Sequence, residues 1–180
     1  MDFRKAILLS LLAPALFASG AGAVPLVNRH SHTTTLLPDG NILVAGGGTT
    51  AGTFTNSVQM YNMATNTFDD WAGGLSVARS SHTATLLSDG RVLIAGGYTG
   101  AGAFTSSLEI CNPIAKTCSP TGLPALNPAR ANHTATLLSG GLHAGKVLIC
   151  GGQNATATPI LNNCDFFDPG NNTLDTGAPD

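Results

Sequence analysis

Apolar residues in this sequence form short runs that recur three times, at intervals of about 50 residues. In each copy an Arg-x-x-His segment leads into a first run of Thr, Ala and Leu, and a polar turn separates it from a second run that is apolar throughout. The first runs are residues 33–37, 83–87 and 134–138, and the second runs are residues 42–45, 92–95 and 147–150. Such short, β-prone runs predict buried strands. The unbroken apolar second run predicts a strand covered on both faces.

Turn-forming residues connect these predicted strands. Asp39-Gly40 and Asp89-Gly90 lie between the first and second runs, and such a pair predicts a two-residue hairpin turn with positive φ at both central positions. A glycine pair ends the second run in every copy. Because glycine has no side chain, the pair allows a sharp exit from the strand and close packing of the backbone.

A third run in each copy alternates apolar and polar side chains, and a turn rich in Asn, Asp and Thr leads to a short fourth run. The third runs are residues 57–61, 107–111 and 163–167, and the fourth runs begin at Phe68, Cys118 and Leu174. No segment after residue 23 has a helical period. The sequence therefore predicts an all-β array of three four-stranded antiparallel units, at about residues 29–78, 79–129 and 130–180.

The first 23 residues have the features of a secretory signal peptide in the usual order. Arg4 and Lys5 precede an apolar run over residues 6–18, and the small residues 21–23 follow it. The run is shorter than the roughly 20 residues that a membrane-spanning helix needs. We therefore expect cleavage after Ala23, export of residues 24–180 to the periplasm or the extracellular space, and no membrane span after cleavage. The alternative is an uncleaved membrane anchor.

Composition narrows the choice of partners. Charged residues make up only 10% of the chain, and without residues 1–23 the net charge is about −3 with neutral histidines. No basic patch suits a nucleic acid, so we expect no nucleic-acid partner. The abundance of Gly, Thr, Ser, Asn and Ala fits short strands and tight turns better than helices.

The repeated pattern resembles the Kelch repeat. The resemblance rests on the histidine before the first strand, the apolar strand ending in Gly-Gly, and an aromatic pair on the third and fourth strands. The pair is Tyr61 and Phe68 in the first copy. Cys111 and Cys118 replace it in the second copy, and Phe167 and Leu174 occupy these positions in the third. Kelch repeats form the blades of β-propellers. The resemblance thus implies a partial β-propeller of three four-stranded antiparallel Kelch-type blades.

The register of the repeat bears on the four cysteines. Cys111 and Cys118 replace the adjacent pair on the third and fourth strands, while Cys150 closes a second strand and Cys164 lies near the start of the next. In an oxidising compartment we expect the disulfides Cys111–Cys118 and Cys150–Cys164. The alternative is four reduced, buried thiols. The spacings match no common zinc signature, and we expect no metal and no cofactor.

Three blades are fewer than the four to eight of typical closed propellers, and they leave two open edges, which are prone to association. Two explanations remain open at this point. The chain is a fragment of a longer protein, which its end at a unit boundary favours, or copies of it self-associate through the open blade edges.

The recurring Arg-x-x-His segments are candidates for either chemistry or structure. They place Arg29 with His32, Arg79 with His82, and Arg130 with His133. Three imidazoles that point alike in a radial repeat could bind a metal near the central channel. We favour the scaffold interpretation, because a residue that a catalyst needs once need not recur in every unit. In it each histidine bonds within its own blade and each arginine ties neighbouring blades together.

The glycine-rich segments 46–52 and 96–102 lack the Gly-Lys-Ser/Thr and the helix of a phosphate-binding loop. We interpret them as loops between the second and third strands, displayed on one face of the propeller. The residues there that could contact a ligand are Phe54, Tyr98, Phe104 and Asn154.

Two functions from different classes follow. The first is an exported, non-catalytic Kelch-type scaffold that binds a protein or glycan partner, with no catalytic residue assigned in this chain. The alternative is the propeller portion of a carbohydrate-active oxidase similar to galactose oxidase, or of a sugar epimerase, with catalytic residues outside this chain. The oxidase resemblance implies a copper site of two Tyr and two His, and it cannot be mapped here, where the only tyrosines are Tyr61 and Tyr98. Whether the chain is an enzyme stays open, and the residues favour a scaffold.

Overall fold

The computed structural model describes residues 26–49, 52–100, 102–155 and 160–176, and the predicted signal peptide, residues 1–23, lies outside them. The described chain is all β. Its strands form three four-stranded antiparallel sheets and one two-stranded ribbon. The described residues include no helix that is long and apolar enough to cross a membrane.

Each four-stranded sheet comes from one copy of the repeat, with its strands in chain order. The first sheet contains β1 (Thr33–Leu36), β2 (Ile42–Ala45), β3 (Val58–Asn62) and β4 (Thr67–Asp70). The second sheet contains β5 (Thr83–Leu86), β6 (Val92–Ala95), β9 (Leu108–Asn112) and β10 (Thr117–Ser119). The third sheet contains β11 (Thr134–Leu137), β12 (Val147–Cys150), β13 (Cys164–Asp168) and β14 (Thr173–Thr176). The prediction of three four-stranded antiparallel units is therefore confirmed, with strand ends shifted by about one residue.

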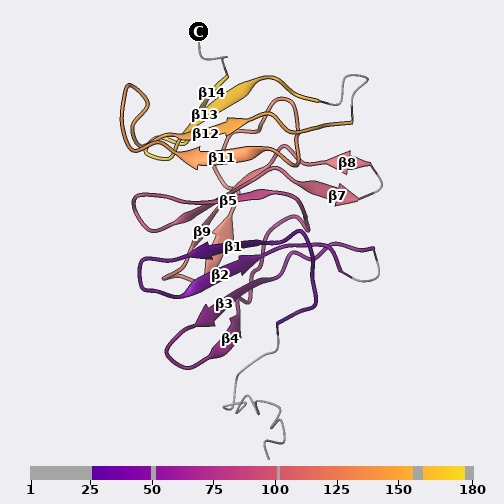
Figure 1. The fold of residues 1–180 in the computed structure, drawn as a ribbon, viewed down its shortest axis with the longest axis vertical. Helices are drawn as coiled ribbons and strands as arrows, with labels where there is room; N and C mark the ends of the chain where they lie inside the picture. The colour runs from indigo at the N-terminus through magenta and orange to yellow at the C-terminus, as the bar shows by residue number, and fades with distance from the viewer. Residues whose placement is uncertain (1–25, 50–51, 101, 156–159, 177–180) are drawn as a thin grey trace, which may run out of the picture.

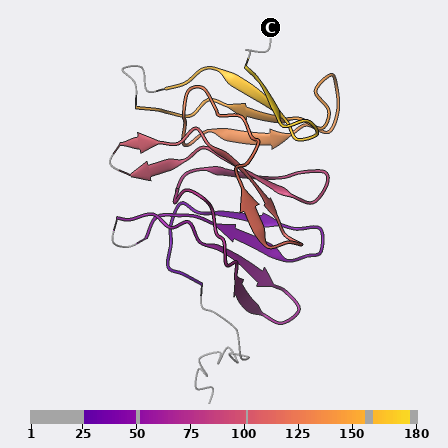
Figure 2. The same ribbon diagram turned by 180° about the vertical axis from the view of Figure 1, so that it is seen from behind.

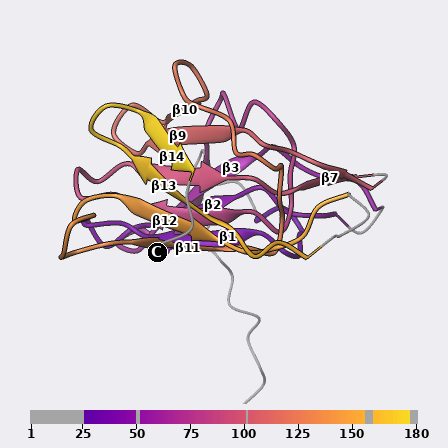
Figure 3. The same ribbon diagram turned by 90° about the horizontal axis from the view of Figure 1, so that it is seen from above.

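The three sheets follow one another along the longest axis of the molecule, from the first at the bottom of Figure 1 to the third at the top. The view from behind in Figure 2 shows the same order. The first strands of the sheets form a row, because β5 contacts both β1 and β11. Seen from above, β1 and β11 lie on one side of the array, and β10 and β14 lie towards the other (Figure 3).

Two apolar cores fill the spaces between successive sheets. Side chains alternate along a strand, so each sheet has one face towards the preceding sheet and one towards the following sheet. Leu43 and Val58 of the first sheet pack with Val92 and Ile94 of the second in one core. The second core contains Leu87, Leu93, Leu108, Val147, Ile149 and Phe167.

The unbroken apolar run of β6 follows from its place in the middle sheet. All four of its residues are buried, since a sheet covers each of its faces. In β12, by contrast, Val147 and Ile149 are buried and the alternate positions Leu148 and Cys150 are only partly so. In β2 the outward-facing Val44 is buried as well and only Ile42 is partly exposed, so the prediction of burial on both faces holds fully for β6, largely for β2 and on one face only for β12.

The Asp-Gly turns are longer than the predicted two-residue turns. The backbone N–H of Leu37 donates to the carbonyl of Asn41 (2.8 Å) and that of Gly40 to the carbonyl of Leu37 (3.0 Å). Gly40 has a φ of 85°, whereas Asp39 does not adopt a positive φ. This is a three-residue connection that ends in a left-handed glycine. The carboxylate of Asp39 instead accepts the N–H of Asn41 (3.0 Å), so the expectation of positive φ at both central residues was wrong.

One of the two predicted loops after the second strand contains regular structure. In the second copy, β7 (Tyr98–Gly100) and β8 (Ala103–Phe104) pair as a short antiparallel ribbon. The ribbon projects beyond the sheets to the right of Figure 1. Its glycines concealed the alternation that usually reveals a strand.

The cysteines form two disulfides, Cys111–Cys118 and Cys150–Cys164. Both pairs are directly opposite in the ladder, the first across β9 and β10 and the second across β12 and β13. This is the pairing that the repeat register predicts. The first disulfide lies in the core between the first and second sheets.

Candidate functional site

The histidines of the recurring segment join neighbouring sheets. His82 Nε2 lies 2.9 Å from the Oγ1 atom of Thr33 in the preceding sheet, and His133 Nε2 lies 2.9 Å from that of Thr83. Both imidazoles are buried, with 5% and 6% of their surface exposed. The expectation that each histidine bonds within its own unit was therefore wrong for His82 and His133. The first strand of the first and second sheets begins next to the Arg-x-x-His segment of the following copy, which brings each pair together.

Burial also sets the protonation state of these histidines. Loss of solvent, followed by the positive charge of Arg79 and the neighbouring His133 and His32, lowers the pKa of His82 to about 3. Burial, followed by the charge of Arg130, lowers the pKa of His133 to about 4. Neutral imidazoles are thus the form that the folded chain favours at neutral pH.

The arginines, in contrast, hold together their own sheets. The guanidinium of Arg79 donates to the carbonyls of Gly96 (2.8 Å) and Ser107 (3.1 Å) and to the carboxylate of Glu109 (2.5 Å). All three acceptors belong to the same copy as the arginine, and the side chains of Arg79 and Glu109 are fully buried. The expectation that each arginine ties neighbouring units together holds for the backbone carbonyls of Arg79 and Arg130, which accept from the preceding copy, and not for the side chains.

The hydrogen bonds of the buried arginine side chain, called the clamp, recur in the other two sheets with a different side-chain acceptor. Arg29 donates to the side-chain oxygen of Gln59 (2.7 Å), and Arg130 donates to the carboxylate of Asp165 (2.9 Å). Asp165 is one methylene shorter than Glu109, and its Oδ1 atom is buried without a hydrogen-bond partner. Burial raises the pKa of Asp165, and the nearby Arg130 lowers it.

Backbone hydrogen bonds of the Arg-x-x-His segment also link neighbouring sheets. Together with the His–Thr contact, these bonds are called the joint between two sheets. The N–H of Gly47 donates to the carbonyl of Arg79 (2.7 Å), and that of Ser81 donates to the carbonyl of Ser31 (2.9 Å). A Cβ on Gly46 would lie 2.6 Å from the carbonyl oxygen of Arg79, so only glycine fits there. Between the second and third sheets the same bonds run from Gly97 to Arg130 and from Asn132 to Ser81.

The recurring segments therefore build joints rather than a metal site. Among the described residues, no group of three His, Cys, Asp or Glu side chains is arranged to hold a metal ion. The Nε2 atoms of His82 and His133 are already engaged by threonine hydroxyls.

Three of the four predicted ligand-contacting residues form one aromatic cluster. Tyr98 lies between Phe54 and Phe104, edge to face with each, and both pairs of ring centroids are 5.4 Å apart. Phe54 comes from the first copy and the other two from the ribbon of the second. Their backbones are held by isolated bridges, Gly48 with Phe54 and Ser80 with Tyr98. All three rings are half-buried, so each keeps an exposed portion.

Asn154 does not share this exposure. It lies in the third copy directly after Gln153, which pairs with Ala131 and Ile160. Only 8% of its surface is exposed, so the prediction that it faces a ligand from an open loop was wrong.

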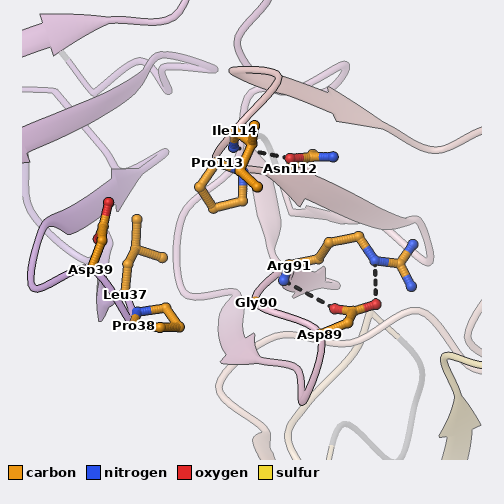
Figure 4. Close-up of a pocket in the computed structure, with 9 residues that line it drawn as sticks. All are labelled: Leu37, Pro38, Asp39, Asp89, Gly90, Arg91, Asn112, Pro113 and Ile114. Carbon is orange, nitrogen blue, oxygen red and sulfur yellow. Dashed lines mark hydrogen bonds and ion pairs between the residues drawn. The ribbon is translucent and has the colours of Figure 1, made fainter.

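A pocket of about 410 Å³ lies at the opposite ends of the strands, between the hairpin turns of the first two sheets (Figure 4). Leu37 and Asp39 line one side, Asp89 and Arg91 another, and Ile114 overhangs from the turn between β9 and β10. Asp89 and Arg91 form an ion pair of 2.6 Å with each other. Sequence reasoning missed this pocket, because each contributing residue belongs to an ordinary turn.

No protein-family model and no curated protein matches this chain. Among solved structures, the chain is similar to one described as "Structure of YjhT", with a TM-score of 0.66 and 13% sequence identity. The match covers 86% of this chain and 47% of that chain. The likeness therefore concerns the fold alone, and this chain spans about half the length of that structure.

Proposed function

We propose that the chain is part of an exported Kelch-type β-propeller that acts as a non-catalytic scaffold and binds a protein or glycan partner. Successive four-stranded antiparallel sheets, each from one copy of a sequence repeat, support the propeller architecture. Its blades would be residues 29–78, 79–129 and 130–180. Two disulfides fit an extracellular or periplasmic protein.

The aromatic cluster of Phe54, Tyr98 and Phe104 is the observation that carries the binding proposal. Aromatic side chains are enriched at recognition surfaces because they offer a large contact area at a small cost in conformational entropy. Here three rings gather on loops from two sheets, which a single loop could not achieve. Loops on a rigid β scaffold are where binding residues usually lie.

Hydrogen bonds hold the loops that carry these rings. The Tyr98 hydroxyl accepts the N–H of Gly102 (2.8 Å), which closes the ribbon. In the neighbouring loop, the N–H of Thr49 donates to the carbonyl of Thr53 (2.8 Å), and the two threonine hydroxyls lie 2.6 Å apart. The cluster is therefore preorganised, with hydroxyl groups beside aromatic rings. That combination suits the mixed polar and apolar surface of a sugar ring or of a protein side chain.

Gly100 shows how closely the two loops approach each other. A Cβ at this position would lie 2.8 Å from the Cε2 atom of Phe54, and the φ of Gly100 is 103°. A side chain there would push Phe54 away from Tyr98. Gly100→Ala thus disturbs the cluster without removing any ring.

Binding to a glycan array and to an array of exported proteins tests the proposal. The unaltered chain is expected to bind one class of probe, and Tyr98→Ala and Gly100→Ala are expected to weaken that binding at least tenfold. Ile114→Ala is the matched control, because this exposed side chain lies at the other ends of the strands. Equal binding by Tyr98→Ala and the unaltered chain would contradict the assignment of the cluster.

A further inference from the structure

The outward faces of the first and third sheets carry side chains that are buried at equivalent positions elsewhere. Leu36 of β1 is 66% exposed, whereas its counterparts Leu86 and Leu137 pack against the preceding sheet. On the third sheet, Leu148 is partly exposed, whereas its counterpart Leu93 is fully buried. Each end of the array therefore exposes an apolar side chain of the inter-sheet layer, although Val44 on the outward face of the first sheet is only 4% exposed.

The polar groups at the two ends are also halves of one joint. Within the array, three groups of the following copy bond to each sheet. They are the carbonyl of that copy's recurring arginine, the N–H of the residue two positions later, and the ring of that copy's recurring histidine. The first sheet has no sheet before it in the described chain. The carbonyl of Arg29, the N–H of Ser31 and the ring of His32 therefore lack the partners that their counterparts have.

The third sheet offers the other half of the joint. In the internal joints, the preceding sheet supplies a glycine N–H, the carbonyl of Ser31 or Ser81, and a threonine hydroxyl. The equivalent groups at the third sheet are the N–H of Gly152, the carbonyl of Asn132 and the hydroxyl of Thr134. Asn132 has a φ of 54°, close to the 53° of Ser31 and the 52° of Ser81, so the backbone at the open end has the same shape as inside the array.

The surroundings of Gly151 support docking of another copy at the open end of the array. A Cβ on Gly96 would collide with the carbonyl of Arg130, but a Cβ on Gly151 would meet only the carbonyl oxygen of Leu161 at 3.6 Å. Among the described residues, none fills the space beside Gly151 that Arg130 fills beside Gly96. A backbone carbonyl placed there would reproduce the internal joint.

We propose that the first sheet of one copy docks on the third sheet of a second copy, head to tail, through the same joint that links the sheets within a chain. His32 then bonds Thr134, the Arg29 carbonyl accepts from Gly152, and Leu36 enters the apolar layer around Leu148. Because donors meet acceptors only when unlike ends meet, head-to-head pairing leaves these groups unpaired. The inference does not depend on what the aromatic cluster binds.

Two copies are the smallest assembly in which every end of the array meets an unlike end. In the proposed dimer the rotation between the copies brings the second pair of ends together, so the head-to-tail contact forms twice and the assembly closes.

One loop limits the extent of the contact. The ring of His143, in the turn between β11 and β12, stacks on Phe166 of β13 with ring centroids 4.1 Å apart. Phe166 is consequently only 9% exposed. The docking surface therefore centres on β11 and β12, where the joint lies.

Light scattering on the purified full chain tests the proposal, together with two variants that place a charge in opposite halves of the interface. The unaltered chain is expected to have twice the monomer mass. Leu36→Arg and Leu148→Arg are each expected to raise the dimer dissociation constant about 100-fold, because an unpaired charge would be buried. An equimolar mixture of the two variants is expected to recover part of the association. In a mixed dimer, the unaltered first sheet of the Leu148→Arg chain docks on the unaltered third sheet of the Leu36→Arg chain.

Circular dichroism and the two intact disulfides serve as checks that each variant folds. Ile114→Arg is the matched control, because Ile114 is 96% exposed and lies on the pocket side of the array. The mass of the unaltered chain is measured over a concentration series that reaches about 1 mM, at which weak contacts are populated. A folded chain that stays monomeric over the whole series overturns the proposal. So does a mixture of the two variants that associates no better than either variant alone.

Discussion

His82 Nε2 lies 2.9 Å from the hydroxyl oxygen of Thr33, so a residue at the start of the second copy is anchored to the first strand of the first sheet. The same contact between His133 and Thr83 joins the next two sheets. Both imidazoles are buried and face a neighbouring arginine. The joints are therefore sensitive to protons.

Acid is expected to weaken the folded chain in a window set by these two histidines. Their pKa values, about 3 and about 4 when folded, lie below the ordinary 6.5 of an unfolded chain, so the unfolded state binds more protons as pH falls below 6.5. Each histidine then removes up to about 1.4 kcal/mol of stability per pH unit until its folded pKa is reached. Urea denaturation between pH 7.5 and pH 5 measures this slope.

Comparison of variants isolates the histidine contribution. Burial raises the pKa of Asp165, which contributes a trend of the opposite sign. His82→Gln and His133→Gln should each flatten the slope, and the double variant should remove most of it above pH 5. A slope that is identical in the unaltered chain and the double variant would show that the joints do not titrate.

In the Leu36→Arg background, which removes the proposed contact between copies, the glycine before each joint is expected to tolerate alanine only at Gly151, beside which the described chain places no further sheet. Gly46, Gly96 and Gly151 have similar positive φ values of 59°, 59° and 67°, so alanine costs about 1 kcal/mol at each for backbone strain. Gly46→Ala and Gly96→Ala should cost about 2 kcal/mol more, because the new Cβ meets a carbonyl of the next copy. Equal losses of unfolding free energy at all three positions would contradict the joint geometry.

The buried clamp of the second sheet should matter more than a surface ion pair. Glu109→Gln leaves the charge of Arg79 without a carboxylate where both side chains are fully buried, and this should cost about 3 kcal/mol of stability. Asp89→Asn is the control, since its pair with Arg91 is 2.6 Å long but substantially exposed, and it should cost less than about 1 kcal/mol. Chemical denaturation at pH 7.5 compares the two, and similar losses would argue against the clamp.

Peptide mapping without reductant should recover Cys111 linked to Cys118 and Cys150 linked to Cys164. The bridges span 7 and 14 residues, so their replacement by paired alanines should cost about 2 and about 3 kcal/mol. A peptide that links Cys111 to Cys150, or four free thiols in the exported protein, would disprove the register of the strands.

The repeat allowed the sheets to be predicted because its signals are local. Alternating and continuous apolar runs depend on neighbours in the chain, and the cysteine pairs follow from strand register. The roles of Arg79 and His82 could not be predicted in the same way. Their contacts depend on which side of a sheet each side chain reaches, and this is decided by packing between sheets rather than by spacing along the chain.

The candidate site was predictable in part for the same reason. The loops that carry Phe54, Tyr98 and Phe104 were identified from glycine content, but their convergence required two sheets to be placed side by side. Asn154 was misassigned because a polar residue in a glycine-rich loop has no local sign of burial. The pocket beside Ile114 arises from three separate turns and has no sequence signature of its own.

The positive-φ residues Ser31, Ser81 and Asn132 repeat one backbone shape at the start of every copy. Because both internal joints use the same bonds, removing or duplicating a whole copy of the repeat replaces one joint by an identical one. A gene encoding such a chain can thus gain or lose units by unequal recombination while the bonds of the joint are kept, and the loops of each unit are left free to diverge.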